Sequence, residues 1–127
     1  MVYLMNYMDQ YENREDPRYE GSFRIKVSLP EAKKSWETCV EDVSITGLRI
    51  KFDCPISVLK ADTDVSIIVD RAFVDSYLGF AGKVMHSYCN SHFTICGIKI
   101  TDIDSESSYK WGKVVELARR KKSNTYI

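Results

Sequence analysis

The chain has 127 residues, of which 44% are hydrophobic and 12% are aromatic. This length suits one ordinary domain with a core of moderate size, and the apolar content argues against intrinsic disorder. Lys and Arg together number 18, Asp and Glu together also number 18, and the formal net charge at pH 7 is zero. A neutral chain has no global field that would attract nucleic acid or a membrane surface, so any anion-binding site must be local.

The cysteines and the N-terminus indicate the cellular setting. The four cysteines form no C-x-x-C pair, and the chain has only two histidines to supplement them, so no metal site is expected. The N-terminus lacks the charged and apolar regions of a secretory signal, and no apolar run approaches the roughly 20 residues that span a bilayer. We expect a cytoplasmic protein with reduced thiols and no integral membrane segment.

The N-terminal part of the chain carries few signals of regular structure. Residues 1–12 are rich in Tyr and Met without a clear period, and we interpret them as a flexible arm or a short helix that docks on the domain. Residues 9–20 hold five carboxylates and two arginines, followed by Gly21 and interrupted by Pro17. This composition predicts an exposed loop.

Strands are predicted over most of the remaining chain. Residues 22–29 alternate strictly between polar and apolar side chains, which is typical of a half-buried strand, and Pro30 ends it. The same reasoning predicts five further strands, at about 35–43, 46–53, 65–70, 77–88 and 92–101. Several short strands at this spacing indicate a barrel or a sandwich.

The last segment changes period and predicts a helix at about 105–121. Four apolar residues fall on one helical face, namely Trp111, Val114, Val115 and Ala118. Ser105 or Ser107 can cap the start of this helix, and basic residues favour its C-terminal end. The predicted order is therefore a barrel at about 22–101 followed by one packing helix.

Two short motifs carry most of the functional information. Arg14 and Arg18 form R-x-x-x-R, and Asp42, Ser44 and Gly47 form D-x-S-x-x-G about one hairpin later. Either motif alone also suits an ordinary loop or turn, because Asp and Ser bond backbone amides and Gly supplies positive φ. The two motifs in this order resemble the PilZ domain, a bacterial receptor module for the second messenger cyclic di-GMP.

The resemblance covers residues 13–121 and implies a mainly β fold. That fold is a small antiparallel barrel of six or seven strands with a C-terminal helix, here in a stand-alone PilZ domain at residues 13–127. A late strand is similar to the family's G-x-x-F pattern, with Ile100 in place of Phe. A second departure is at Asn13 and Glu15, where many members carry an additional arginine.

Cyclic di-GMP presents two phosphodiesters and two guanines, and the motif residues suit both. Arg14 and Arg18 offer planar forks for phosphate oxygens or for the O6/N7 edge of guanine. Asp42 can accept from the guanine N1–H and N2–H₂ groups, and Ser44 offers a hydroxyl and its N–H. Gly47 is expected to allow a turn that exposes Asp42 and Ser44 on the barrel surface.

One further contact is implied by the resemblance alone. In some family members an aromatic side chain of the fifth strand stacks on a guanine, and His86 stands at the position that aligns with it. His86 can stack in the same way. The alternative is a histidine at the barrel rim without a ligand.

The resemblance implies a cyclic di-GMP effector that changes conformation on binding and regulates an unidentified downstream partner. Motility, biofilm or exopolysaccharide formation and virulence are the outputs reached through such modules. The sequence has no Ser-His-Asp order, P-loop or dinucleotide-binding glycine pattern, so no enzymatic activity and no cofactor are expected. A monomer or weak homodimer is expected.

Two other interpretations remain open. One is a PilZ-fold assembly or interaction protein that binds no nucleotide, which the intact motifs disfavour. The other is a β-barrel that binds single-stranded nucleic acid through aromatics and a basic helix bearing Lys110, Lys113 and residues 119–122. Zero net charge and a pI near 6.7 disfavour this one.

Overall fold

The structure is a computed structural model that describes residues 17–21, 23–70 and 76–125. The predicted arm at residues 1–12 and Arg14 lie outside the described residues. The described residues form these elements in chain order: β1 (Tyr19–Glu20), β2 (Arg24–Leu29), β3 (Lys34–Ser44), β4 (Gly47–Phe52), β5 (Asp64–Val69), β6 (Gly79–Cys89), β7 (Thr94–Asp102) and α3 (Ser105–Thr125).

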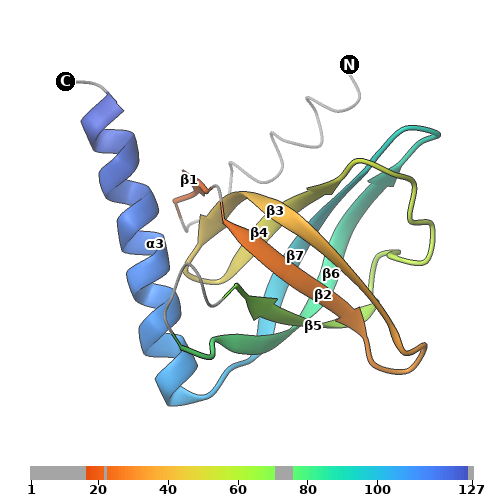
Figure 1. The fold of residues 1–127 in the computed structure, drawn as a ribbon, viewed down its shortest axis with the longest axis horizontal. Coiled ribbons are helices and arrows are strands. Elements are labelled where there is room, and N and C mark those ends of the chain that lie inside the picture. Colours follow the sequence, from red (N-terminus) through yellow and green to blue (C-terminus); the bar gives the residue numbers. More distant parts are fainter. Residues whose placement is uncertain (1–16, 22, 71–75, 126–127) are drawn as a thin grey trace.

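The strands form a closed antiparallel barrel with one added strand. The sheet order is β1-β3-β2-β5-β6-β7-β4, and an additional pairing between β3 and β4 closes it. Six strands make up the barrel, while β1 pairs with β3 alone among the described strands. The predicted mainly β architecture, with a barrel of six or seven strands followed by a helix, is confirmed (Figure 1).

Strand β3 pairs first with β2 and then with β4, and this double pairing closes the barrel. Residues 34–39 pair with β2, whereas Val40 to Ser44 pair with β4. The register with β4 shifts between Val40 and Asp42, which places a β-bulge at Glu41. Bulges increase local twist and redirect side chains, so this irregularity lies where the D-x-S-x-x-G motif begins.

The alternating residues of the strands fill the barrel interior. In β2 the buried Ile25 and Val27 alternate with the exposed Arg24 and Lys26, as the period of two predicts. Comparable positions of the other strands complete the core, among them Val43, Leu48, Ile50, Val65, Ile67, Val69, Val84 and Ile98. A continuous apolar interior of this kind stabilises the barrel.

Helix α3 lies along one side of the barrel and contacts β1 and β3 (Figure 1). Its predicted apolar face is buried, and the ring of Trp111 meets those of Phe23 and Phe80 edge-on, with centroids 6.2 and 5.1 Å away. The predicted cap at Ser105 or Ser107 is wrong, because Asp104 Oδ1 accepts the backbone N–H of Ser107 at 2.7 Å. In the described part of the chain, no helix is long and apolar enough to span a membrane.

Candidate functional site

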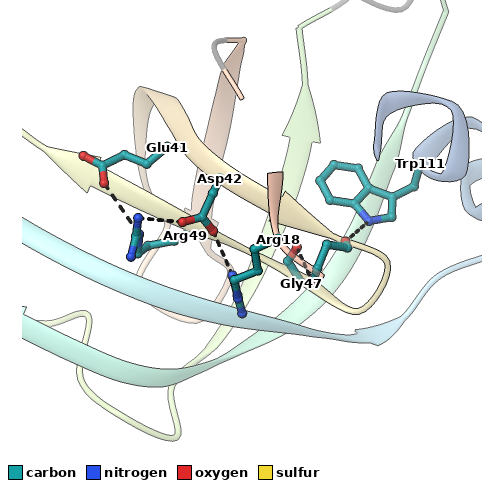
Figure 2. A network of polar contacts seen from close by, with 7 residues as sticks. Arg18, Glu41, Asp42, Gly47, Arg49 and Trp111 are labelled. Carbon is teal, nitrogen blue, oxygen red and sulfur yellow. Dashed lines mark hydrogen bonds and ion pairs between the residues drawn. The ribbon is translucent and has the colours of Figure 1, made fainter. Parts of the chain in front are cut away.

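The carboxylate of Asp42 lies between two arginines that come from different parts of the chain. Arg18 Nη1 is 2.9 Å from Asp42 Oδ1, and Arg49 Nη2 is 2.6 Å from Asp42 Oδ2. Figure 2 shows the two guanidinium groups approaching Asp42 from opposite sides. All three side chains are largely buried, with exposed fractions of 9% for Arg18, 12% for Asp42 and 15% for Arg49.

The bulge in β3 explains why Arg49 meets two consecutive carboxylates. Arg49 Nε is 3.6 Å from Glu41 Oε2, in addition to the contact between Arg49 and Asp42. Neighbouring side chains of a regular strand point to opposite faces and would not reach the same partner. The bulge at Glu41 interrupts that alternation and brings both carboxylates to the outer face near Arg49.

Arg18 is held by its position next to a very short strand. Tyr19 pairs with Val43 and Glu20 pairs with Asp42, so β1 adds to β3 immediately after Arg18. Pro17 restricts the backbone directly before Arg18, which limits the directions that its side chain can take. The R-x-x-x-R segment therefore ends at the edge of the D-x-S-x-x-G strand, as the expected ligand site requires.

Strand pairing places further residues of the barrel surface in line with Asp42 and Arg49. Asp42 lies opposite Arg49 on β4, Arg49 lies opposite Gly97 on β7, and Gly97 lies opposite His86 on β6. Directly paired residues of antiparallel strands project from the same face of the sheet, so these four positions form one row. Gly97 has no side chain, and it separates Arg49 from His86 by two strand spacings, about 10 Å.

A surface pocket of about 500 Å³ lies at one end of this row. Its lining residues are Arg18, Glu20, Gly21, Val40, Glu41, Asp42 and Arg49. Among the described residues, two arginines and three carboxylates line the pocket, so this part of the lining has no excess of positive charge. An anion that enters needs arginine forks released from their carboxylates, or further cations from the chain.

Ser44 was expected to be exposed, but it is buried. Its exposed fraction is 1%, its hydroxyl donates to the Gly47 carbonyl at 3.4 Å, and its own carbonyl accepts the Trp111 Nε1–H at 2.9 Å (Figure 2). Helix α3 therefore supplies a buried indole donor to the turn, which local sequence does not reveal. Asp42, whose exposed fraction is 8% when its backbone is counted together with its side chain, is also more buried than the exposed turn that was expected.

Gly47 is required because a side chain there would block the approach of a neighbouring strand. It does not adopt a positive φ. A Cβ at this position would lie 2.2 Å from the carbonyl oxygen of Ile98, well inside van der Waals contact. Gly47 therefore permits the close approach of β4 to β7, which fixes the turn that follows Asp42 and Ser44.

The structure brings some of the predicted site residues together. Of those that it describes, Arg18 and Asp42 line the pocket, whereas Ser44, Gly47 and His86 do not. Their roles as ligand contacts stay predictions, as does that of Arg14 outside the described residues. Sequence reasoning missed Arg49, which alternates with apolar neighbours in β4 and looks like an ordinary outward-facing charge.

Among the described residues, neither a metal site nor an activated buried thiol is present. They contain no group of three or more His, Cys, Asp or Glu side chains placed to hold a metal ion. The buried Cys96 is also not activated, because burial raises the pKa of its thiol to about 11, against the opposing effect of a hydrogen bond with Ser87.

Solved structures with the same fold come from several bacteria. The PilZ domain of YcgR from Escherichia coli, solved with c-di-GMP, has a TM-score of 0.71 and 9% identity over 90% of this chain and 97% of that one. The K. pneumonia MrkH–c-di-GMP complex has a TM-score of 0.67 and 12% identity over 87% of this chain and 53% of that one. The Bacillus subtilis inhibitor of motility MotI/DgrA has a TM-score of 0.68 and 10% identity, covering 88% of this chain and 52% of that one.

The chain spans about half the length of the MrkH and MotI/DgrA structures that it matches. At these identities the likeness establishes the fold alone. No curated protein sequence matches the chain. The family comparison is more specific, since the PilZ domain matches residues 12–116, which include both motifs. The chain therefore belongs to the PilZ domain family.

Proposed function

We propose that this protein is a receptor for cyclic di-GMP. The observation that carries the proposal is the contact between Arg18 and Asp42, 2.9 Å apart at the edge of a surface pocket. This contact joins the R-x-x-x-R and D-x-S-x-x-G motifs, although Arg18 and Asp42 are 24 positions apart in the sequence. Membership of the PilZ family and the c-di-GMP complexes of YcgR and MrkH support the same ligand.

Each part of the ligand has a chemical counterpart in or near the pocket. Arg14 and Arg18 bind phosphate oxygens or the O6/N7 edge of a guanine with their planar forks. Asp42 accepts from the N1–H and N2–H₂ groups of a guanine, which adenine does not present in that arrangement. His86 stacks on a base at the far end of the row that contains Gly97.

Binding involves an exchange of ion-pair partners. Among the described lining residues, three carboxylates outnumber the two arginines, so a dianionic ligand gains little from this arrangement of charges. When Arg18 turns from Asp42 to a phosphate, it gains a bidentate partner and releases one carboxylate oxygen toward the guanine. Arg14 adds the remaining cation from the same segment.

Helix α3 is placed to report this exchange to a partner. It contacts β1, the strand that directly follows Arg18, and Trp111 of α3 binds the Ser44 carbonyl two residues after Asp42. A movement of β1 or of the turn at Ser44 therefore changes the contacts that hold α3 against the barrel. In this proposal the protein is a non-catalytic effector, and the downstream partner that it regulates binds the surface formed by α3 and β1.

The nucleic-acid alternative has less support. Lys110 is 3.3 Å from Glu106 and donates to the Tyr77 carbonyl at 2.8 Å. Glu116 contacts Arg119 and Arg120, and the hydrogen bond from Arg119 holds the pKa of Glu116 at about 2. These local pairs reduce the positive charge that α3 offers to a phosphate backbone.

Thermal unfolding with and without nucleotide tests the proposal. A ligand at a hundredfold excess over its Kd stabilises the protein by about 2.7 kcal/mol if it binds only the folded state. We expect cyclic di-GMP to raise Tm and to protect amides of residues 13–20 from exchange, with cyclic di-AMP and GTP as controls. Unchanged Tm and unchanged exchange with cyclic di-GMP would contradict the receptor and favour an assembly protein that binds no nucleotide.

A further inference from the structure

We propose that Arg49 is a positioning residue that holds the Asp42 carboxylate in place when Arg18 moves to the ligand. This inference rests on the proposed function, because it concerns how the same pocket recognises guanine. Arg49 belongs to neither of the two motifs, and its place in the site follows from strand pairing alone.

The two arginines hold different oxygens of the same carboxylate. Arg18 Nη1 contacts Oδ1 of Asp42 at 2.9 Å, and Arg49 Nη2 contacts Oδ2 at 2.6 Å. Loss of one contact therefore leaves the other intact (Figure 2). When Arg18 departs, Oδ1 becomes available to a guanine N–H while Oδ2 stays bound to Arg49.

The backbones that carry the two arginines differ in how firmly they are held. Arg49 lies in the middle of β4 and is paired on both sides, with Asp42 of β3 and with Gly97 of β7. In the described part of the chain, Arg18 precedes the two-residue strand β1, which pairs with β3 at Tyr19 and Glu20 and is followed by one more backbone hydrogen bond, from the Gly21 N–H to the Glu41 carbonyl at 3.0 Å. Short edge pairing opens at lower free energy than a barrel strand, so Arg18 is the partner that moves.

Charge balance gives Arg49 a second role in the same event. Asp42 has an exposed fraction of 12%, and a carboxylate so poorly hydrated is strongly disfavoured without a cationic partner. Arg49 supplies that cation after Arg18 has turned to the phosphate. The contact of Arg49 Nε with Glu41 Oε2, at 3.6 Å, steadies the guanidinium from the opposite end.

A double-mutant cycle on the full chain tests the proposal, with cyclic di-GMP binding measured by calorimetry. Arg49→Ala should weaken binding about tenfold in the parent, since the 2.6 Å ion pair of Arg49 with Asp42 is lost. In an Asp42→Asn background the same substitution should change affinity less than about twofold, because the carboxylate that Arg49 orients is already absent. Arg49→Lys keeps the charge without the planar fork and should lie between.

Specificity provides a readout that a merely structural role would not change. Cyclic di-IMP lacks the guanine N2 amino group, so the ratio of its Kd to that of cyclic di-GMP reports contacts to this amino group. Arg49→Ala should reduce this ratio, since a misoriented Asp42 no longer distinguishes the two bases. The matched control is Arg24→Ala, which removes an exposed strand arginine paired with Glu37 at 3.7 Å and should leave both affinities unchanged.

The outcomes separate this inference from the proposed function. Absence of cyclic di-GMP binding by the parent would contradict the receptor itself, and the role of Arg49 with it. Binding by the parent together with parent-like affinity of Arg49→Ala, or with equal effects of Arg49→Ala in both backgrounds, would contradict only the role of Arg49. If Arg49→Ala lowers Tm too far for titration, Arg49→Lys is measured instead, in the parent and in the Asp42→Asn background. Equal effects of Arg49→Lys on affinity in the two backgrounds would contradict the role of Arg49.

Discussion

The indole of Trp111 and the carbonyl of Ser44 are joined by a buried hydrogen bond of 2.9 Å that connects α3 to the D-x-S-x-x-G turn. Trp111 has an exposed fraction of 2%, so water cannot replace the bond. The two residues are 67 positions apart in the chain. This long-range contact makes the last helix part of the support of the candidate ligand site.

Trp111→Phe should destabilise the fold by about 1 to 3 kcal/mol, because it leaves a buried carbonyl without its donor and shortens the ring. Urea unfolding measures the change. Trp36→Phe is the control, since Trp36 is half-buried and packs on Phe52 at a centroid distance of 6.5 Å. An equal or larger loss in the control would show that ring packing, and not the Ser44 bond, accounts for the effect.

Arg18→Ala and Arg14→Ala should each weaken cyclic di-GMP binding by about tenfold to a hundredfold, the value of a lost charge-assisted hydrogen bond. Both variants should remain folded, because the barrel closes through β3 and β4 without β1. Titration calorimetry and a thermal melt check the two statements. Either variant binding like the parent would remove that arginine from the site.

Asp42→Asn should lower the preference for cyclic di-GMP over cyclic di-AMP, because an amide replaces an acceptor oxygen with a donor. Asn is preferable to Ala here, since an empty position would leave Arg18 and Arg49 facing each other in a poorly hydrated place. Competition binding with the two nucleotides gives the preference. An unchanged ratio would show that guanine is read elsewhere.

Gly47→Ala should destabilise the barrel, since its Cβ would lie 2.2 Å from the Ile98 carbonyl oxygen. Gly112→Ala is the matched control, because a Cβ there meets nothing within 4 Å. The control lies inside α3 and should stabilise the protein by about 0.5 to 1 kcal/mol through helix propensity. Thermal melts of the two variants should move in opposite directions, and a parent-like Tm for Gly47→Ala would contradict the close-approach account.

Cys96 should resist alkylation in the folded protein at pH 8. Burial raises the pKa of its thiol to about 11, so the thiolate is scarce and poorly accessible. The exposed Cys39, Cys54 and Cys89 serve as internal controls in a mass-spectrometric iodoacetamide time course. Labelling of Cys96 at the rate of the others would show that the core around β7 opens readily.

The period of two identified six of the strands to within about two residues, because alternation is written locally in the sequence. Strand β1 was missed, since two residues are too few to show any period. The cap was misassigned to Ser105 or Ser107 because the local sequence does not show which side chain bonds the first turn, and in the structure Asp104 accepts the bond from Ser107.

The site was predicted in part for a similar reason. Arg18 and Asp42 belong to motifs and could be found by spacing, whereas Arg49 joins them through the register of β3 with β4 and through a bulge. Ser44 was expected to be exposed, because nothing near it in the sequence indicates that Trp111 covers it. Contacts between distant segments decide these features, and a local pattern does not encode them.

Calorimetric titration of the full chain with cyclic di-GMP, beside the same titration of Arg18→Ala, tests the central claim most directly. The account predicts saturable binding to the parent, an affinity lower by at least about tenfold in the variant, and weaker binding of cyclic di-AMP to the parent. No heat of binding in the parent, or equal affinity in parent and variant, would contradict it.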